Sequence, residues 1–476
     1  MPSRARAPRS PSSLARQLTT SNQSEAQQPW SRRRAGVLLH PTSLPGPGRF
    51  GVLGSDARRF VDLIADAGFT VWQMLPVGPV DATRSPYLMK SVNAGNPELI
   101  DAEDAYFPKK SEFRDFYDAN HSWATAYALF MALHERFDDA PWWEWPEGLR
   151  DHDPHDLAAA LDELQEPMRQ VIAGQIIFAR QWRDLQDYAH ARGVLIIGDL
   201  PFYVDHDSVE TWWQRKLFKL NDSGQPDVVA GVPPDYFSED GQRWGNPVYD
   251  WAGMQADGFR WWCERIAHQL HRFDAIRIDH FRALEACWEI PAAAETARDG
   301  HWEPVPGADL LAALRAQFPQ LPLFAEDLGT ITPEVRALRD DFDLPGMLVL
   351  QFAFDGVPDN PYLPHNHVEH AVVYTGTHDN DTTVGWYESL DDGMRDAVHT
   401  TLNDDSPMPD ALISAALASP AQLAVMPMQD LLGLGAHSRM NVPGTTDGNW
   451  GWRFDWQDVP SDFAARWRDA VTSHDR

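Results

Sequence analysis

The stretch GVLIIGDLPFYV (193–204) is an almost unbroken run of apolar residues that is interrupted in its second half by an acid, Asp199, and by Pro201. A strand with this composition is buried on both faces, as the strands of parallel sheets are. The amphipathic pattern over 168–192, just before it, predicts a helix. A helix that leads into a strand buried on both sides indicates the α/β class.

Six further segments repeat this pattern along the chain. They are GVLLHPTSL (36–44), TVWQMLPV (70–77), DAIRIDHF (274–281), LPLFAEDLG (321–329), GMLVLQFAF (346–354) and AVVYTGTHDN (371–380). Helical patterns such as 55–67 and 258–272 separate them. ACWEI (286–290) is a plausible eighth strand, so the sequence predicts a closed (β/α)8 TIM barrel.

Two segments do not belong to a plain barrel. Residues 82–167 are too many for one βα connection and are rich in Trp and in helical patterns, which predicts an inserted subdomain that walls the C-terminal face. Residues 1–34 are rich in Arg, Ser and Pro, which predicts a disordered tail, although this composition also fits a transit peptide or a misassigned start codon. The catalytic barrel should then occupy residues 35–476.

Charge and composition exclude several classes of protein. The formal net charge of -30 disfavours nucleic acid and anionic membranes as partners, whereas a neutral sugar polymer is not repelled. No apolar run is long enough to span a bilayer. Two cysteines, Cys263 and Cys287, give neither a disulfide framework nor a metal-binding spacing, so we expect a soluble cytoplasmic protein. The acidic surface reflects either a salty cytoplasm or codon bias.

Polar residues gather where the expected strands end. They are His40, Asp199, Asp279, Glu326, His378 and Asp379. The C-terminal ends of barrel strands carry the catalytic residues of TIM-barrel enzymes, so this face is the expected active site.

Alternation along DAIRIDHF places Arg277 and Asp279 on one face of a strand. The guanidinium can hold the carboxylate ionised and oriented, which makes Asp279 a candidate nucleophile. The alternative is a buried pair that only stabilises the barrel.

Glu326 and Asp327 are neighbours, so at most one of them faces the barrel axis. A carboxyl there, among apolar groups and other acids, would have a raised pKa and could act as a general acid. The alternative is an acid cluster that starts the helix after it. Spacing alone does not choose between the two residues.

His378 and Asp379 follow the expected seventh strand, and a third acid there could favour the oxocarbenium-like state of a sugar ring. A metal site is the alternative, at this pair or at HNHVEH (365–370), but neither has a regular ligand spacing. The loop 230–251 carries Tyr236, Phe237, Trp244, Tyr249 and Trp251, which could stack on an acceptor sugar and exclude water, or could simply pack into the insertion.

The segment GPGRFG (46–51) matches the dinucleotide-binding pattern G-x-G-x-x-G. Pro47 lies inside it, and no acid ends a second strand at the required distance, so we set this interpretation aside.

The motifs of the chain resemble those of the amylomaltases, the short 4-α-glucanotransferases. The resemblance covers about residues 36–456 and rests on HPTSLPGP, SPY with AGNPELID, GDLPFYV, GVPPDYFSEDGQRWGNPVYDW, RIDHFRAL, AEDLG, GTHDN and RMNVPGTTDGNW. It implies a retaining barrel enzyme that acts on α-1,4-glucans and maltooligosaccharides and needs no metal or organic cofactor. After SPY, the residues Leu88, Met89 and Lys90 depart from the family's pattern, which puts the acceptor preference in doubt.

The resemblance also implies roles for single residues. Asp279 would be the nucleophile, Glu326 the acid/base and Asp379 the stabiliser of the transition state. The remaining residues expected to bind substrate are Arg277, His280, His378, Asp199, Tyr87, Trp244, Asn246 and Asn441, with Tyr236, Phe237 and Asp327 added from the aromatic loop and the acid pair. A hydrolase on the same barrel and a glucan-binding protein with an inactive site are the rival functions, and the oligomeric state is open.

Overall fold

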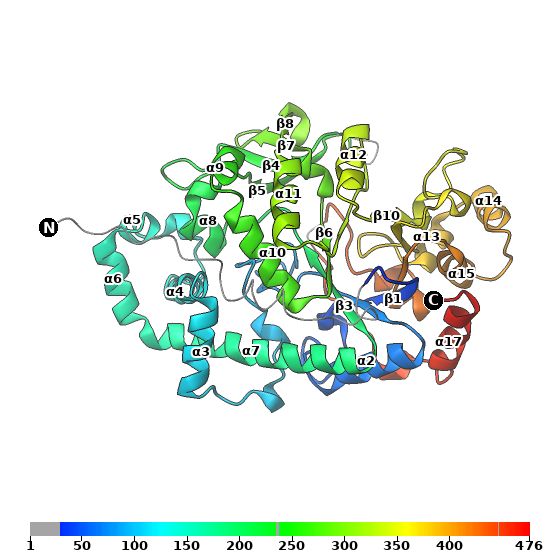
Figure 1. Cartoon of the computed structure of the whole chain (residues 1–476), viewed down its shortest axis with the longest axis horizontal. Coiled ribbons are helices and arrows are strands. Elements are labelled where there is room, and N and C mark those ends of the chain that lie inside the picture. Colours follow the sequence, from blue (N-terminus) through cyan, green and yellow to red (C-terminus); the bar gives the residue numbers. More distant parts are fainter. Residues whose placement is uncertain (1–28, 235–237, 446) are drawn as a thin grey trace.

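The computed structural model describes residues 29–234, 238–445 and 447–476, and its centre is an eight-stranded parallel sheet (Figure 1). The strands follow one another in the order β10-β11-β12-β1-β2-β3-β6-β9. Their bounds are β1 (Arg34–Leu38), β2 (Val71–Gln73), β3 (Leu195–Leu200), β6 (Ala275–Ile278), β9 (Leu323–Ala325), β10 (Gly346–Val349), β11 (Ala371–Tyr374) and β12 (Leu423–Pro427). The Ala325 N–H donates to the Pro345 carbonyl oxygen (2.8 Å), so β9 meets β10 and the sheet closes. The predicted (β/α)8 barrel is confirmed.

The predicted eighth strand is wrong. ACWEI forms β7 (Ala286–Pro291), which belongs to a separate antiparallel sheet with β4 (Val228–Val232), β5 (Gln242–Pro247) and β8 (His301–Pro304). Only the short turn η7 (Phe281–Leu284) separates β7 from β6, whereas a parallel crossover needs a dozen or more residues. The eighth barrel strand is β12, whose residues are all buried.

Along each barrel strand, residues that face the barrel interior alternate with residues that face the surrounding helices. Val71, Ile197, Phe324 and Val425 belong to the apolar cluster inside the barrel. The residues next to them in the chain belong to the larger cluster between strands and helices: Trp72, Ile196, Leu323 and Ala424. Because side chains alternate along a strand, this phase also sets which polar residues at the strand ends face the barrel axis.

The helices fall into three groups. Those packed around the barrel are α2 (Ser55–Asp66), α7 (Gln165–Ala191), α10 (Arg260–Arg272), α11 (Gly307–Gln317), α12 (Pro333–Asp341), α15 (Asp410–Ala418) and α17 (Phe463–Ser473). Those before α7 are α3 (Lys110–Asn120), α4 (Ala124–Arg136), α5 (Glu147–Arg150) and α6 (Pro154–Glu163). The remaining helices lie in the segments after β3, β5, β11 and β12: α8 (Val209–Trp213), α9 (Trp251–Ala256), α13 (Thr383–Ser389), α14 (Asp392–Leu402) and α16 (Met428–Leu431).

The helices between β2 and β3 build a second apolar core. It includes the buried side chains of Trp123, Phe130, Trp142 and Ile172, together with Trp212 from α8. Figure 1 shows α3 to α6 on one side of the barrel and α13 to α15 on the other. Among the residues that the structure describes, no helix combines the length and the apolar character that crossing a bilayer requires.

The N-terminal boundary needs a correction. Arg34 is 1% exposed and begins β1, and the Trp30 ring packs edge-on against Phe324 inside the barrel, with ring centres 5.9 Å apart. Arg33 donates to the backbone oxygens of Ser419 (2.6 Å) and His474 (2.9 Å). Residues 29–34 therefore pack against the barrel rather than belonging to a tail, and residues 1–28 lie outside the described residues.

Candidate active site

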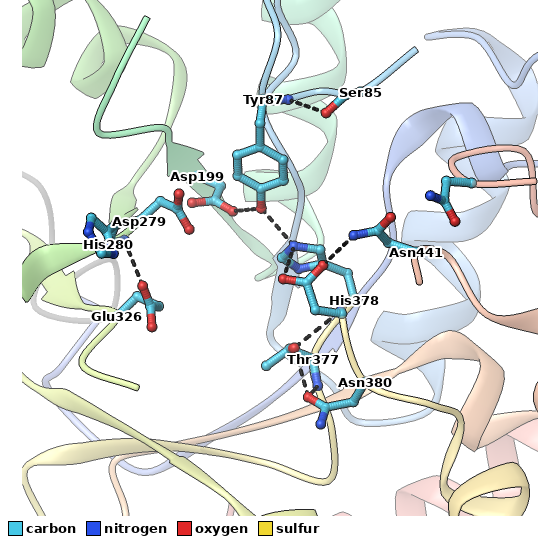
Figure 2. Close-up of polar contacts among 12 residues, drawn as sticks. Ser85, Tyr87, Asp199, Asp279, His280, Glu326, Thr377, His378, Asn380 and Asn441 are labelled. Carbon is cyan, nitrogen blue, oxygen red and sulfur yellow. Dashed lines mark hydrogen bonds and ion pairs between the residues drawn. The ribbon is translucent and has the colours of Figure 1, made fainter. Parts of the chain in front are cut away.

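Four barrel strands bring charged side chains together at their C-terminal ends. Asp199 lies in β3, Arg277 in β6, Asp279 just after β6, and Glu326 just after β9. His378 and Asp379 follow β11. Figure 2 shows Asp199, Asp279, Tyr87 and His378 pointing toward one another. The acids and the histidine that were expected at the C-terminal face from β3, β6, β9 and β11 therefore form one compact cluster.

Arg277 joins two of the acids. Its Nη1 donates to both oxygens of Asp199 (2.8 Å each) and to Asp279 Oδ1 (2.9 Å). The Arg277 side chain is 6% exposed, whereas that of Asp279 is 28% exposed. Side chains alternate between the two faces of β6. Ala275 faces the barrel interior, so Arg277, two positions later, faces it too. One oxygen of Asp279 is thus fixed while the other remains open to a reaction partner.

Glu326 accepts two backbone hydrogen bonds. The His280 N–H donates to Oε2 (2.6 Å), as Figure 2 shows, and the Leu328 N–H donates to Oε1 (3.0 Å). His280 has a φ of 49°, in the left-handed region that side chains other than Gly rarely adopt. This turn directly follows Asp279 and aims the His280 N–H at Glu326, so it sets the two carboxyls in a fixed relation.

Burial raises the pKa of both carboxyls. Burial raises the pKa of Glu326 to about 8, with the charge of Arg277 opposing the rise and the charge of Asp279 adding to it. Burial also raises the pKa of Asp279 to about 7, and Arg277 opposes this rise through its charge and its hydrogen bond. The direct hydrogen bond from the Arg277 cation favours the ionised form of Asp279, and Glu326 has no such contact with Arg277 in the described structure.

Tyr87 connects Asp199 to His378. Its hydroxyl donates to Asp199 Oδ2 (2.7 Å) and lies 2.9 Å from His378 Nε2. Burial lowers the pKa of His378, so the ring is neutral near pH 7. Because the one Tyr87 proton goes to Asp199, His378 Nε2 must carry the hydrogen that the Tyr87 oxygen accepts. The two rings stack with centres 5.4 Å apart.

Asp379 is held from the C-terminal part of the chain. Asn441 Nδ2 donates to Asp379 Oδ1 (2.7 Å), and His378 Nε2 lies 3.3 Å from Asp379 Oδ2. Arg439 donates to the Asp379 backbone oxygen (3.0 Å). The Asp379 side chain is 46% exposed, so its contacts rather than packing set its direction.

The aromatic loop is only partly as expected. Trp244, on β5, is 37% exposed and meets the His280 ring edge-on, with ring centres 4.8 Å apart. Asn246 Nδ2 donates to the Val204 backbone oxygen (2.8 Å). Tyr249 and Trp251 are buried core residues, which corrects the expectation that they stack on an acceptor. Tyr236 and Phe237 lie outside the described residues.

Asp327 does not join the cluster. Its Oδ1 accepts the Met347 N–H (2.8 Å) and its Oδ2 accepts Arg339 Nη1 (2.6 Å). Both oxygens are therefore engaged in linking β9 to β10 and α12. Of the two neighbouring acids that spacing could not separate, only Glu326 lies beside Asp279 and His280.

The sequence interpretation missed Trp450 and Arg439. The Trp450 ring lies 6.0 Å from the rings of both Tyr87 and His378. Trp450 has a φ of 61°, an unusual value for a bulky residue. Both residues belong to RMNVPGTTDGNW, where no periodic pattern marks a side chain as buried or functional.

A metal is not needed to explain any contact in the cluster. In the described ranges, the group of acids and histidines close enough to share an ion is Asp153, His155 and Asp156, all exposed at the start of α6. Asp153 caps that helix by accepting the N–H groups of the other two, which accounts for the grouping.

Comparison with known proteins identifies the family. The sequence matches the family described as "4-alpha-glucanotransferase" over residues 39–110 and 103–458. The chain belongs to the 4-α-glucanotransferase family. The 4-alpha-glucanotransferase of Thermus thermophilus is 43% identical over 93% of this chain and 99% of its own length. That of Synechocystis is 42% identical over 89% and 94% of the two chains.

Solved structures agree with this assignment. The amylomaltase from Streptococcus agalactiae in complex with acarbose superposes with a TM-score of 0.90 at 34% identity, covering 94% of this chain and all of that one. The amylomaltase resemblance drawn from the motifs is confirmed. The chain is therefore an enzyme with the 4-α-glucanotransferase activity of its family, on a TIM barrel.

Proposed function

We propose that the chain transfers α-1,4-glucan segments by a double displacement in which Asp279 is the nucleophile, Glu326 the acid/base and Asp379 the stabiliser of the transition state. The observation that carries this assignment is the difference between the two carboxyls. Arg277 donates a hydrogen bond to Asp279 and favours its ionised form, whereas the hydrogen bonds that Glu326 accepts come from the backbone N–H groups of His280 and Leu328. Two carboxyls whose surroundings separate their pKa values divide the roles of base and acid between them.

In the first step, the open oxygen of Asp279 attacks the anomeric carbon of the donor glucan. The bond to the leaving oxygen breaks as Glu326 gives that oxygen its proton. Asp379, fixed by Asn441, faces the positive charge that develops on the ring. The products are a covalent glycosyl-enzyme and a shortened glucan with a free 4-hydroxyl.

In the second step, the ionised Glu326 takes the proton of an incoming 4-hydroxyl. The oxygen of that hydroxyl attacks the anomeric carbon, and Asp279 leaves as a carboxylate. Transfer requires that a sugar reach the intermediate before water does. The exposed Trp244 ring beside His280 supports this preference, because an aromatic face can stack on an acceptor sugar and exclude water.

The remaining polar residues of the cluster are proposed to bind the donor sugar. Arg277, Asp199, Tyr87 and His378 form one hydrogen-bonded chain beside Asp279. Such a chain presents donors and acceptors in fixed directions, which suits ring hydroxyls. The inserted helices are proposed to wall the cleft. The free cysteines Cys263 and Cys287 support a reducing compartment such as the cytoplasm, where maltodextrins would be the substrates.

The activity is tested by incubating the purified protein with maltotriose alone. Free glucose, the maltooligosaccharide ladder and total reducing ends are followed together. Transfer produces glucose and longer oligosaccharides while the number of reducing ends stays constant. A rise in reducing ends without longer products would instead show a hydrolase, and no turnover at all would show a binding protein.

The residue roles are tested with Asp279→Asn and Glu326→Gln. Each should lower kcat by about three or more orders of magnitude while glucan binding persists, because each removes a group that acts in the transition state. Asp327→Asn is the matched control, since Asp327 neighbours Glu326 but bonds to Met347 and Arg339. It should lower the stability and leave kcat within a few-fold. Turnover near that of the wild type in Asp279→Asn or Glu326→Gln would remove that residue from its role.

A further inference from the structure

The loop after β11 carries His378 and Asp379, and most of it is buried while its tip at Asp379 is open to solvent. Residues 375–383 connect β11 to α13, and the Asp379 side chain at the middle is 46% exposed. An exposed carboxylate has several rotamers available, so a defined direction must come from the loop backbone and from fixed partners. The question is what holds this loop.

The middle of the loop is held by its own side chains and by Gln351. Asn380 Oδ1 accepts the N–H (2.9 Å) and the hydroxyl (2.8 Å) of Thr377, as Figure 2 shows. Gln351 Nε2 donates to the Asp381 backbone oxygen (2.9 Å). A Cβ at Gly376 would lie 2.7 Å from Gln351 Nε2, so glycine permits this close approach. These contacts shape the loop but do not fix its two ends.

Both ends of the loop are held by one buried acid. Asp430 is 1% exposed and lies in α16, directly after β12. Its Oδ2 accepts the hydroxyls of Thr375 (2.6 Å) and Thr383 (2.7 Å), and its Oδ1 accepts the Thr383 N–H (2.7 Å). Thr375 is the first residue after β11, and Thr383 is the first residue of α13. A single carboxylate thus joins the start of the loop to its end and ties both to the neighbouring strand.

We infer that Asp430 is a positioning residue for the reaction: by closing the ends of the loop 375–383 through Thr375 and Thr383, it sets the direction of Asp379 at the donor sugar. The inference rests on the proposed role of Asp379. The hydrogen bonds of Asp430 go to Thr375 and Thr383 and not to Asp379, so Asp430 acts through the backbone of the loop. Hydrogen bonds to a buried carboxylate are short and directional, which suits a group that must hold two chain segments in register.

The effect should appear in the chemical step. Asp379 is proposed to act on the transition state, so a small shift in its position lowers kcat and leaves KM nearly unchanged. Misplacement of a catalytic group by about 1 Å costs on the order of a hundredfold in rate. Loss of one hydroxyl from the Asp430 contacts should move the loop less than that, with a fall in kcat of about tenfold.

The test uses Thr375→Val and Thr383→Val, which remove one hydroxyl each and keep the side-chain shape. Asp430→Asn is the conservative variant, because its amide still faces both threonines. Thr211→Val is the matched control: Thr211 lies buried in α8, and its hydroxyl donates to the His206 backbone oxygen (2.6 Å). The first step is followed by fluoride release from a maltosyl fluoride, which reports glycosyl-enzyme formation even in slow variants. Unfolding curves accompany each variant.

The decisive comparison repeats Thr375→Val in an Asp379→Asn background. If Asp430 acts through Asp379, Thr375→Val lowers kcat about tenfold in the wild-type chain and has almost no effect once Asp379 is neutralised. Asp430→Asn should retain more activity than the double variant that carries both Thr375→Val and Thr383→Val. The control Thr211→Val should keep the wild-type kcat. Equal losses in both backgrounds, or a loss of stability with unchanged kcat, would overturn the inference. An unaffected Asp379→Asn variant would instead contradict the proposed role of Asp379.

Discussion

At the scale of single residues, Glu326 should make the enzyme less stable than it would be without that acid. Burial raises its pKa from 4.5 to about 8 in the folded state, so the folded protein disfavours the ionised form. Stability is therefore lost as the pH rises from 4.5 toward 8. Glu326→Gln cannot ionise, and because Glu326 is part-exposed we expect it to gain only about 2 kcal/mol near pH 8 and almost nothing near pH 4.

Urea unfolding of both proteins across this pH range measures the difference. Asp327→Asn provides the comparison, because that carboxylate is held by Arg339 and its loss should destabilise the fold. A wild-type chain that matches Glu326→Gln in stability at pH 8 would show that the folded state does not oppose ionisation.

The same two carboxyls should set the pH dependence of catalysis. The proposed mechanism needs Asp279 ionised and Glu326 protonated in the free enzyme. The pKa of Asp279 is raised to about 7 and that of Glu326 to about 8, so kcat/KM for maltotriose should rise through the first value and fall above the second. The falling limb should disappear in Glu326→Gln when the donor is a glycosyl fluoride, whose leaving group needs no proton. A falling limb that persists in that variant would assign it to another residue.

Single residues could be predicted from the sequence where the alternation of side chains along a strand decides which face a residue lies on. Arg277 and Asp279 share a face because they lie two positions apart in a strand, and this needs no knowledge of the fold. The choice between Glu326 and Asp327 required the partners that β10 and α12 supply to Asp327, and these come from distant segments. Trp450 and Asp430 were missed for the same reason, since their roles depend on contacts across the barrel face rather than on local pattern.

At the scale of elements, β5 should decide between transfer and hydrolysis. Trp244 is the exposed aromatic of this strand and stands over His280. Trp244→Ala should raise KM for a glucose acceptor about tenfold, because an aromatic contact contributes about 1 kcal/mol or slightly more, and should increase hydrolysis relative to transfer several-fold. Initial rates of glucose release and of new reducing ends measure both effects.

Trp213→Ala is the matched control for this change. Trp213 is also an exposed tryptophan, at 41%, but it ends α8 rather than facing His280. It should leave the ratio of transfer to hydrolysis unchanged, and Trp244→Phe should retain most of the transfer. Equal effects of Trp213→Ala and Trp244→Ala would contradict a specific acceptor role for Trp244.

Seven of the eight barrel strands were predictable, because a strand buried on both faces leaves an unmistakable apolar run. The error at β7 has a physical cause. ACWEI has good strand composition, but only η7 separates it from β6, and that distance forbids a parallel crossover. Strand composition indicates that a segment is extended, whereas the length of the connection decides which sheet it can join.

At the scale of the whole molecule, the excess of acids should make stability depend on salt. The chain has a formal net charge of -30, and like charges at this density repel one another and favour expansion. Raising KCl from about 0.01 M to about 1 M shortens the Debye length from about 30 Å to about 3 Å. The repulsion is then screened, and the melting temperature should rise by about 1 °C for each kcal/mol gained, because unfolding 476 residues has an entropy of about 1 kcal/mol per degree.

Two comparisons separate screening from other salt effects. Potassium sulfate at equal ionic strength should give a similar shift if screening dominates, and a much larger one if exclusion of sulfate from the surface dominates. The kcat for maltotriose should stay nearly constant over the same KCl range, because the substrate is neutral and the Arg277 guanidinium that holds Asp279 is buried, where salt screens it weakly. An activity that needs molar KCl would point to adaptation to a salty cytoplasm. A melting temperature that stays flat over the range would show that ion pairs such as Arg298 with Asp240 already offset the excess of acids locally.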